Sequence, residues 1–210
     1  MNKDVKDSYK IFSKFYDSLI EPMNSGLRSI GFKMLPPKSG MKVLDIGCGT
    51  GAHLVYYQKV LCQVFGVDTS PSMIKLAQLK LGERADLRLA NASSLPFRDN
   101  HFDIILLSTI LHELAPELRI KVLTEAHRVL NESGRILIID FHPGPLKPLK
   151  GYIYKVIINI AEFLAGREHF KNSRQYLASG GIPALIDDCK MKIEDYKIVS
   201  GGNFGIFIIK

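Results

Sequence analysis

Cysteine is scarce in this chain of 210 residues, which contains only Cys48, Cys62 and Cys189. Three scattered cysteines supply neither a disulfide framework nor the ligand spacing of a zinc site, so we expect reduced thiols. Residues 1–7 are polar and include acidic side chains, unlike a signal peptide. No uninterrupted apolar run approaches the roughly 18 residues that a membrane-spanning helix needs. Together these features predict a cytoplasmic protein.

The net charge is +7, but the basic residues are dispersed along the chain. There is no run of five basic residues and no arginine-rich tail, so the positive charge permits an anionic partner without indicating nucleic acid. With 46% hydrophobic and 23% charged residues, the composition is that of an ordinary globular protein. The length fits a single large α/β domain over residues 1–210. None of this indicates an oligomeric state.

The stretch Val43–Gly51 reads as a short apolar strand that runs into three alternating glycines. The helical stretch Ala52–Leu61 follows, and a second apolar strand, Gln63–Val67, leads into Asp68. This order is typical of the nucleotide-binding half of an α/β sheet, where the acid some 20 residues downstream binds ribose hydroxyls. The spacing is G-x-G-x-G, not the G-x-G-x-x-G of dinucleotide-binding proteins, and His53 occupies a position where a Walker loop needs Ser or Thr.

The segment VLDIGCGTG (Val43–Gly51) resembles the first motif of class I S-adenosylmethionine-dependent methyltransferases. The resemblance covers roughly Lys42–Lys210 and implies a Rossmann-like, mostly parallel seven-strand sheet with helices on both faces and a late antiparallel hairpin. It implies S-adenosylmethionine as the cofactor and S-adenosylhomocysteine as its product. Within the family, the chain is most similar to the group that includes quinone-biosynthesis and phospholipid methyltransferases.

The same resemblance assigns cofactor contacts to residues at and after the ends of the first four strands. Asp68 would hold the ribose hydroxyls, and Asn91 would accept from the adenine amino group where family members usually carry Asp. An amide oxygen can make that bond without the charge that strengthens it. The cofactor-binding residues expected in this way are Asp45, Gly47, Cys48, Gly49, Gly51, Asp68, Thr69, Met73, Asn91, Ala92 and Ser108.

Hydrophobic periodicity predicts a helical cover over residues 1–40, ahead of the glycine motif. One helix would carry the apolar face of Tyr9–Ile20, and a second would carry Leu27, Ile30 and Met34 before Pro36-Pro37 ends it.

Further apolar runs predict strands at residues 86–90, 102–108 and 135–140. A helix is expected to begin at Pro116 and to end at Gly134. A hairpin of residues 192–199 and 204–209, turned by Gly201-Gly202, would close the sheet.

Methyl transfer from a sulfonium requires little acid–base machinery, because orientation of donor and acceptor supplies much of the rate. A base is needed only for an acceptor that arrives protonated, and the candidates are His112 after the fourth strand and His142 after the fifth. His169 lies in the variable part of the chain. No metal site is expected, because Pro116 stands where H-E-x-x-H would have its second histidine.

The leading hypothesis is therefore an enzyme that methylates a small, apolar, lipid-like or quinone-like molecule. DNA is disfavoured as the acceptor, because Ser108–Leu111 does not resemble the N-P-P-Y tetrad of DNA amino-methyltransferases. One alternative is a protein that binds S-adenosylmethionine or S-adenosylhomocysteine without turnover, as a sensor or subunit. Another is a nicotinamide oxidoreductase, which the glycine spacing opposes.

Residues 141–175 are expected to form an insert, or lid, with a helix near residues 152–165. One face of that helix is apolar, and Lys155, Asn159 and Glu162 form a narrow polar stripe opposite. The apolar face either packs on the sheet and closes the pocket, or rests on anionic lipid as a peripheral membrane contact through residues 147–166. The residues of this apolar face are Ile153, Val156, Ile157, Ile160 and Leu164.

Overall fold

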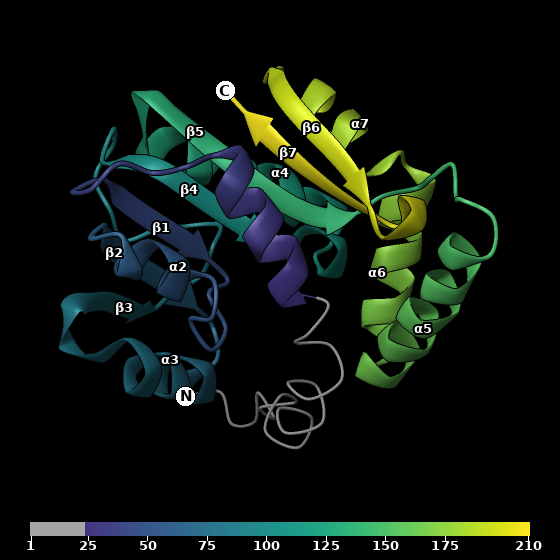
Figure 1. Ribbon diagram of the computed structural model, residues 1–210, viewed down its shortest axis with the longest axis horizontal. Coiled ribbons are helices and arrows are strands. Elements are labelled where there is room, and N and C mark those ends of the chain that lie inside the picture. The colour runs from purple at the N-terminus through teal and green to yellow at the C-terminus, as the bar shows by residue number, and fades with distance from the viewer. Residues whose placement is uncertain (1–23) are drawn as a thin grey trace.

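A twisted seven-stranded sheet forms the centre of the computed structural model, which describes residues 24–210 (Figure 1). The strand order is β3-β2-β1-β4-β5-β7-β6, and β7 runs opposite to the other six strands. The strands are β1 (Lys42–Ile46), β2 (Gln63–Asp68), β3 (Ala85–Leu89), β4 (Phe102–Ser108), β5 (Leu130–Phe141), β6 (Ile193–Val199) and β7 (Phe204–Ile209). This confirms the predicted mostly parallel sheet and its late hairpin.

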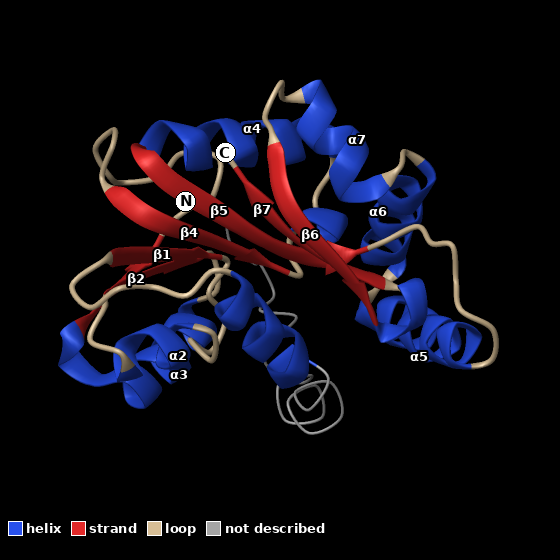
Figure 2. Ribbon diagram, turned by 45° about the horizontal axis from the view of Figure 1, so that its top comes forward, coloured by secondary structure: helices blue, strands red, loops and turns tan. Residues whose placement is uncertain are grey.

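Helices cover both faces of the sheet, so its central strands are apolar almost throughout. Figure 2 shows α4 and α7 on one face, with α2, α3 and the helix of residues 24–34 on the other. The helices are α2 (Leu54–Lys59), α3 (Pro71–Leu81), α4 (Pro116–Val129), α5 (Lys150–Ala165), α6 (Arg167–Ala178) and α7 (Gly181–Asp188). Three short 3-10 turns are η1 (Gly82–Arg84), η2 (Leu111–Glu113) and η3 (Ser200–Gly202).

The helix of residues 24–34 confirms the second part of the predicted N-terminal cover. Leu27 is buried, and a Cβ on Gly31 would lie 3.0 Å from Leu137 and 3.1 Å from Ile139. The helix therefore packs closely on β5, beside the carboxyl ends of the strands. The other predicted helix, Tyr9–Ile20, lies outside the described residues.

The strand order reverses between β1 and β4. From β1 the chain adds β2 and β3 on one side, and it then returns to add β4 and β5 on the other side. The chain leaves β1 toward α2 on one face and leaves β4 toward α4 on the other. At such a point the loops after the two strands diverge, and α/β sheets bind their ligands in the crevice between them.

The prediction that Gly134 ends the helix begun at Pro116 is wrong. Helix α4 ends at Val129, and Leu130 is already extended and pairs with Phe102. Gly134 lies inside β5, where an added Cβ would stand 2.7 Å from the Leu130 side chain. The glycine is thus required for packing within the strand and does not cap a helix.

Two helices, not one, form the insert after β5, and they lie together beyond the carboxyl end of β5 (Figures 1 and 2). Of the two alternatives for α5, packing of its apolar face on the sheet is wrong, because that face is exposed and Glu162 of the polar stripe is only 6% exposed. The exposed apolar positions include all five predicted ones, Ile153, Val156, Ile157, Ile160 and Leu164. Within residues 24–210, no helix has the length and apolar character to cross a membrane.

Candidate functional site

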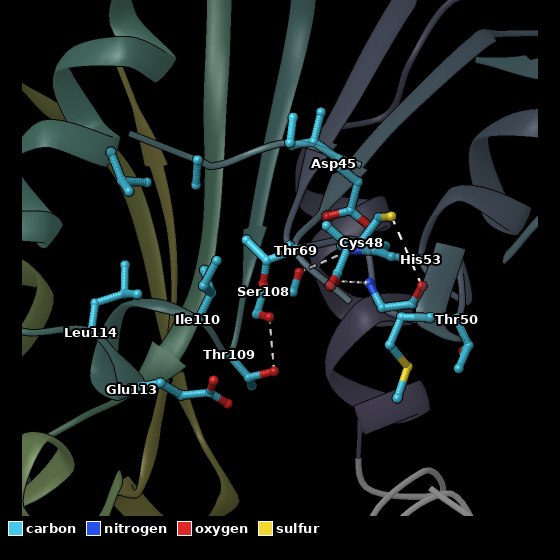
Figure 3. Close-up of a pocket in the computed structure, with 18 of the residues that line it drawn as sticks. Asp45, Cys48, Thr50, His53, Thr69, Ser108, Thr109, Ile110, Glu113 and Leu114 are labelled. Carbon is cyan, nitrogen blue, oxygen red and sulfur yellow. Dashed lines mark hydrogen bonds between the residues drawn. The ribbon is translucent and has the colours of Figure 1, made fainter. Parts of the chain in front are cut away.

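A cavity of about 270 Å³ opens at the carboxyl ends of β1, β2 and β4 (Figure 3). Its walls come from the loops after β1, β2, β3 and β4 and from Asn24 and Arg28 of the N-terminal helix. Every predicted cofactor-binding residue except Gly51 lines it: Asp45, Gly47, Cys48, Gly49, Asp68, Thr69, Met73, Asn91, Ala92 and Ser108. Segments spread over some 60 residues of sequence therefore meet at the place that the motif predicts.

Two of the motif glycines have different roles in the loop after β1. Gly49 has a φ of +52°, and an added Cβ would meet nothing within 4 Å, so the bare backbone leaves room for a ligand. Gly51 has a φ of +72°, and a Cβ there would stand 2.8 Å from Leu81 of α3. Gly51 therefore serves the packing of the loop on α3, which explains why it does not line the cavity.

Asp68 is fixed at the end of β2 by two backbone donors. Its Oδ2 accepts from the Gly49 N–H at 2.9 Å, and its Oδ1 accepts from the Ser70 N–H at 2.8 Å. A carboxylate has about four lone-pair positions, so each oxygen keeps one acceptor position. The arrangement suits a ligand with two adjacent hydroxyl groups, such as a ribose.

Asn91 lines the cavity, but its side-chain oxygen is already engaged. Oδ1 accepts from both the N–H and the hydroxyl of Ser93, each at 2.9 Å. An adenine amino group would have to compete with Ser93 for this oxygen. The role predicted for Asn91 therefore requires the turn after β3 to rearrange.

Asp45 is buried at 2% exposure in the cavity wall. Burial raises the pKa of its carboxyl to about 8; Arg28 acts in the opposite direction, and the charge of Asp68 adds to the rise. Its Oδ1 is buried without a hydrogen-bond partner. Such a carboxyl group is stabilised by a proton or by a cationic group of a ligand.

His53 also lines the cavity, although it was not among the residues predicted to bind a ligand. Its Nδ1 lies 2.9 Å from the Ser108 hydroxyl, whereas its Nε2 is buried without a partner. Burial, with a further contribution from Arg28, lowers the pKa of His53 to about 3, so the ring is neutral. The only sequence signal was its position two residues after the last motif glycine.

The opposite wall of the cavity is apolar and comes from the loop after β4 and the start of α4. Figure 3 shows Ile110, Glu113 and Leu114 on this side and Asp45 and Cys48 across the cavity. Leu118 and Val122 continue the apolar wall. Glu113, which the sequence analysis did not select, is the ionisable group of this wall.

Neither histidine predicted as a base lines the cavity. His112 is 2% exposed, and its Nδ1 lies 2.5 Å from Asp140 Oδ1. Burial favours its neutral ring, but Asp140 and Glu162 outweigh burial and raise the pKa of His112. His142 accepts a hydrogen bond from the Gly144 N–H at 3.2 Å, away from the cavity. Their predicted catalytic roles have no support from this placement.

Cys48 faces the cavity as a thiol. Burial raises the thiol pKa, and the nearby Asp45 and Asp68 raise it further. A protonated thiol is a poor nucleophile, which agrees with the packing role expected for this residue.

Comparisons with known proteins agree with the fold and indicate a family. A family model described as "Methyltransferase domain" matches residues 44–138. The ubiquinone/menaquinone biosynthesis C-methyltransferase UbiE of Psychromonas ingrahamii is 30% identical over 179 residues, which cover 78% of this chain and 69% of that protein.

Two solved structures share the fold. The PH0226 protein from Pyrococcus horikoshii OT3 has a TM-score of 0.70 and 19% identity, with 99% of each chain covered. The 1,6-didemethyltoxoflavin-N1-methyltransferase of Burkholderia thailandensis, solved with S-adenosylhomocysteine bound, has a TM-score of 0.62 and 20% identity. That match covers 95% of this chain and 86% of the other.

The raised pKa of Asp45 predicts a specific pH dependence of stability. Between the ordinary carboxyl pKa of 3.8 and the folded value of about 8, the folded protein binds a proton that the unfolded chain has lost. This contribution is fully present below pH 3.8 and is lost as the pH rises through 8. The free energy of unfolding, relative to Asp45→Asn, should fall by up to about 1.4 kcal/mol per pH unit in this window.

Urea unfolding of both ligand-free proteins from pH 5 to 9 measures this difference. Parallel stability curves for the wild type and Asp45→Asn would show that Asp45 titrates normally.

Proposed function

The chain belongs to the class I S-adenosylmethionine-dependent methyltransferases, and on this basis we propose that it methylates a ring carbon of a small, apolar, quinol-like acceptor. The observation that carries the proposal is the division of the cavity into a polar wall and an apolar wall. The relative named as a ubiquinone/menaquinone biosynthesis C-methyltransferase supports the same acceptor class. The alternative of binding without turnover has no support from the relatives, which are named as enzymes.

The polar wall fits the methyl donor. The open position beside Gly49, the two free acceptor positions of Asp68 and the unpartnered Oδ1 of Asp45 are features that the donor would use. Asp68 binds the ribose hydroxyls, and ionised Asp45 faces the cationic part of the molecule. The donor, when bound, supplies a methyl group activated by its positively charged sulfur.

The apolar wall binds the acceptor ring. Ile110, Leu114, Leu118 and Val122 exclude water and hold the ring against the donor side of the cavity, which lowers the entropic barrier to transfer. Methylation at carbon is favoured when a ring hydroxyl loses its proton. Glu113 is the carboxylate on this wall that can accept it.

Exposed apolar side chains on α5 support a contact with a membrane, where an acceptor with a lipid tail would dissolve. Tyr152 and Phe163 extend the apolar face described above, with 62% and 64% of their surface exposed. Lys147, Lys150 and Lys155 are exposed nearby. A helix of this kind binds the headgroup region of an anionic bilayer, so we assign this face to anionic lipid.

Donor binding is tested with Asp68→Ala and a matched control, Glu83→Ala, in exposed η1. Hydrogen bonds to a charged acceptor contribute about 1.5–3 kcal/mol each, so loss of one implies a rise in dissociation constant of roughly tenfold or more. Calorimetry with S-adenosylhomocysteine should show this rise for Asp68→Ala alone. Equal affinities in two folded variants would contradict the ribose assignment.

The acceptor is tested by incubation with isotopically labelled S-adenosylmethionine and a reduced 1,4-naphthoquinone lacking a ring methyl. We expect mass analysis to find the label on a ring carbon. In Leu114→Gln the KM for this quinol should rise about tenfold or more, because burial of a leucine side chain contributes about 1.5–3 kcal/mol.

The control for this substitution is Leu79→Gln, at a leucine of α3 that is 76% exposed. Its KM should equal that of the wild type, and donor affinity should be unchanged in both variants. Binding of S-adenosylhomocysteine without methylation of the quinol would overturn the acceptor class and leave the donor assignment intact.

Membrane contact is tested by sedimentation with vesicles that contain anionic phosphatidylglycerol. Binding should weaken with added salt and in Ile157→Asp, whereas Leu79→Asp on α3 should bind like the wild type. No binding to these vesicles, or a chain that self-associates through this face, would contradict the proposal.

A further inference from the structure

A cluster of ionisable side chains lies behind the apolar wall, outside the donor cavity. It joins three elements: His112 comes from η2, Glu162 from α5 and His169 from α6. One ligand atom of each residue lies within 4.8 Å of the others. We propose that His112 Nε2, His169 Nε2 and the Glu162 carboxylate bind a divalent transition-metal ion, with Zn²⁺ the ion that this donor set suits best.

The spacing of the donors fits an ion placed between them. Glu162 Oε1 lies 3.6 Å from His112 Nε2, and Glu162 Oε2 lies 3.2 Å from His169 Nε2. Ligand atoms about 2.1 Å from a tetrahedral ion lie about 3.4 Å from one another. Direct charge-assisted hydrogen bonds close to about 2.7–2.9 Å, so the observed separations match a ligand shell better than direct pairing.

The Glu162 carboxylate provides an independent indication. The residue is 6% exposed, and its Oε2 is buried without a hydrogen bond of acceptable geometry, despite its proximity to His169. A buried carboxylate oxygen in this state is costly unless a cation satisfies it. Its position between two imidazole rings supplies the site for that cation.

Asp140 holds His112 in the orientation that metal ligation requires. Its Oδ1 is 2.5 Å from His112 Nδ1, while its Oδ2 accepts from the Leu111 N–H at 2.8 Å. Asp140 is fully buried at the end of β5. With the Nδ1 proton directed to Asp140, Nε2 carries the lone pair and points toward the cluster. Metal-binding histidines commonly have such a carboxylate partner.

Glu113 lies between the cluster of His112, Glu162 and His169 and the apolar wall of the cavity. Glu113 Oε1 is 3.7 Å from His169 Nε2 and 4.0 Å from His112 Nε2, and Glu113 also lines the cavity. Metal binding requires the Nε2 atoms of both histidines to be unprotonated, and Asp140, Glu113 and Glu162 then carry three negative charges in a largely buried cluster. A divalent ion reduces this charge to one.

A bound ion would fix the insert to the acceptor wall. The Asn172 side-chain N–H₂ of α6 already donates to the Glu113 carbonyl at 2.8 Å, and Arg119 donates to the Asn172 carbonyl at 2.8 Å. The ion would add a bond from each of α5 and α6 to η2. This proposal goes beyond methyl transfer and holds whatever the acceptor is.

The test uses the full chain, stripped with a chelator and dialysed, and titrated with Zn²⁺ by calorimetry and with Co²⁺ by visible absorption. We expect one ion per chain, a Co²⁺ spectrum of tetrahedral intensity and a rise in thermal midpoint with Zn²⁺. Loss of an outer partner of a metal site weakens binding by about 10- to 100-fold, and loss of a direct ligand should weaken it further.

His169→Ala and Glu162→Gln should therefore lose the Co²⁺ spectrum, while His127→Ala, at an exposed histidine of α4, should retain it. Stabilisation by S-adenosylhomocysteine serves as the check that each variant is folded, because the donor wall lies outside the cluster. The metal site would be overturned if the wild type bound no ion. It would also be overturned if His169→Ala and Glu162→Gln bound the ion as tightly as the wild type does. Neither outcome would alter the assignment of the donor or the acceptor.

Discussion

The buried carboxylate of Asp140 is the constraint on which the apolar wall of the cavity depends. It accepts hydrogen bonds from the backbone N–H groups of Leu111 and Phe141 and pairs with the His112 ring. These contacts connect the end of β5 to η2, the turn that follows β4. Because Glu113 belongs to the same turn, Asp140 determines where the apolar wall lies and where α6 can dock. A carboxylate with no exposed surface is stable there only because its oxygens are engaged.

The donor side depends on a similar device at the other end of the crevice. Asp68 connects the end of β2 to the loop after β1 through the Gly49 N–H. Asp45 is the exception in this wall, because its buried oxygen has no partner and its pKa is raised to about 8. A binding site that leaves a polar group unsatisfied loses stability in the free state and regains it when the ligand binds. The polar wall thus holds one buried carboxyl group that a proton stabilises in the empty site and that a cationic ligand would stabilise in its place.

The insert after β5 adds α5 and α6 to a fold that many proteins share. Parallel sheets of this kind support numerous reactions, and the loops and inserts at their carboxyl edge decide the substrate. In this chain, α5 directs Glu162 inward and its apolar side chains outward. The same helix therefore faces the buried cluster on one side and presents an exposed apolar surface on the other.

The sequence alone determined the sheet, the glycine turn and most of the donor wall, because each depends on residues that are adjacent or regularly spaced. It could not determine the role of Gly134, which depends on how closely the Leu130 side chain packs against it. Nor could it determine which face of α5 is buried. Periodicity separates the polar face of α5 from its apolar face. Burial of Glu162 on the polar face depends on His112 of η2, which is 50 residues away in sequence. Likewise, no recognisable spacing in the sequence indicates that Glu113 lines the cavity or that His112, Glu162 and His169 form a cluster. Only the tertiary structure brings them together, because contacts between distant segments depend on how whole elements pack.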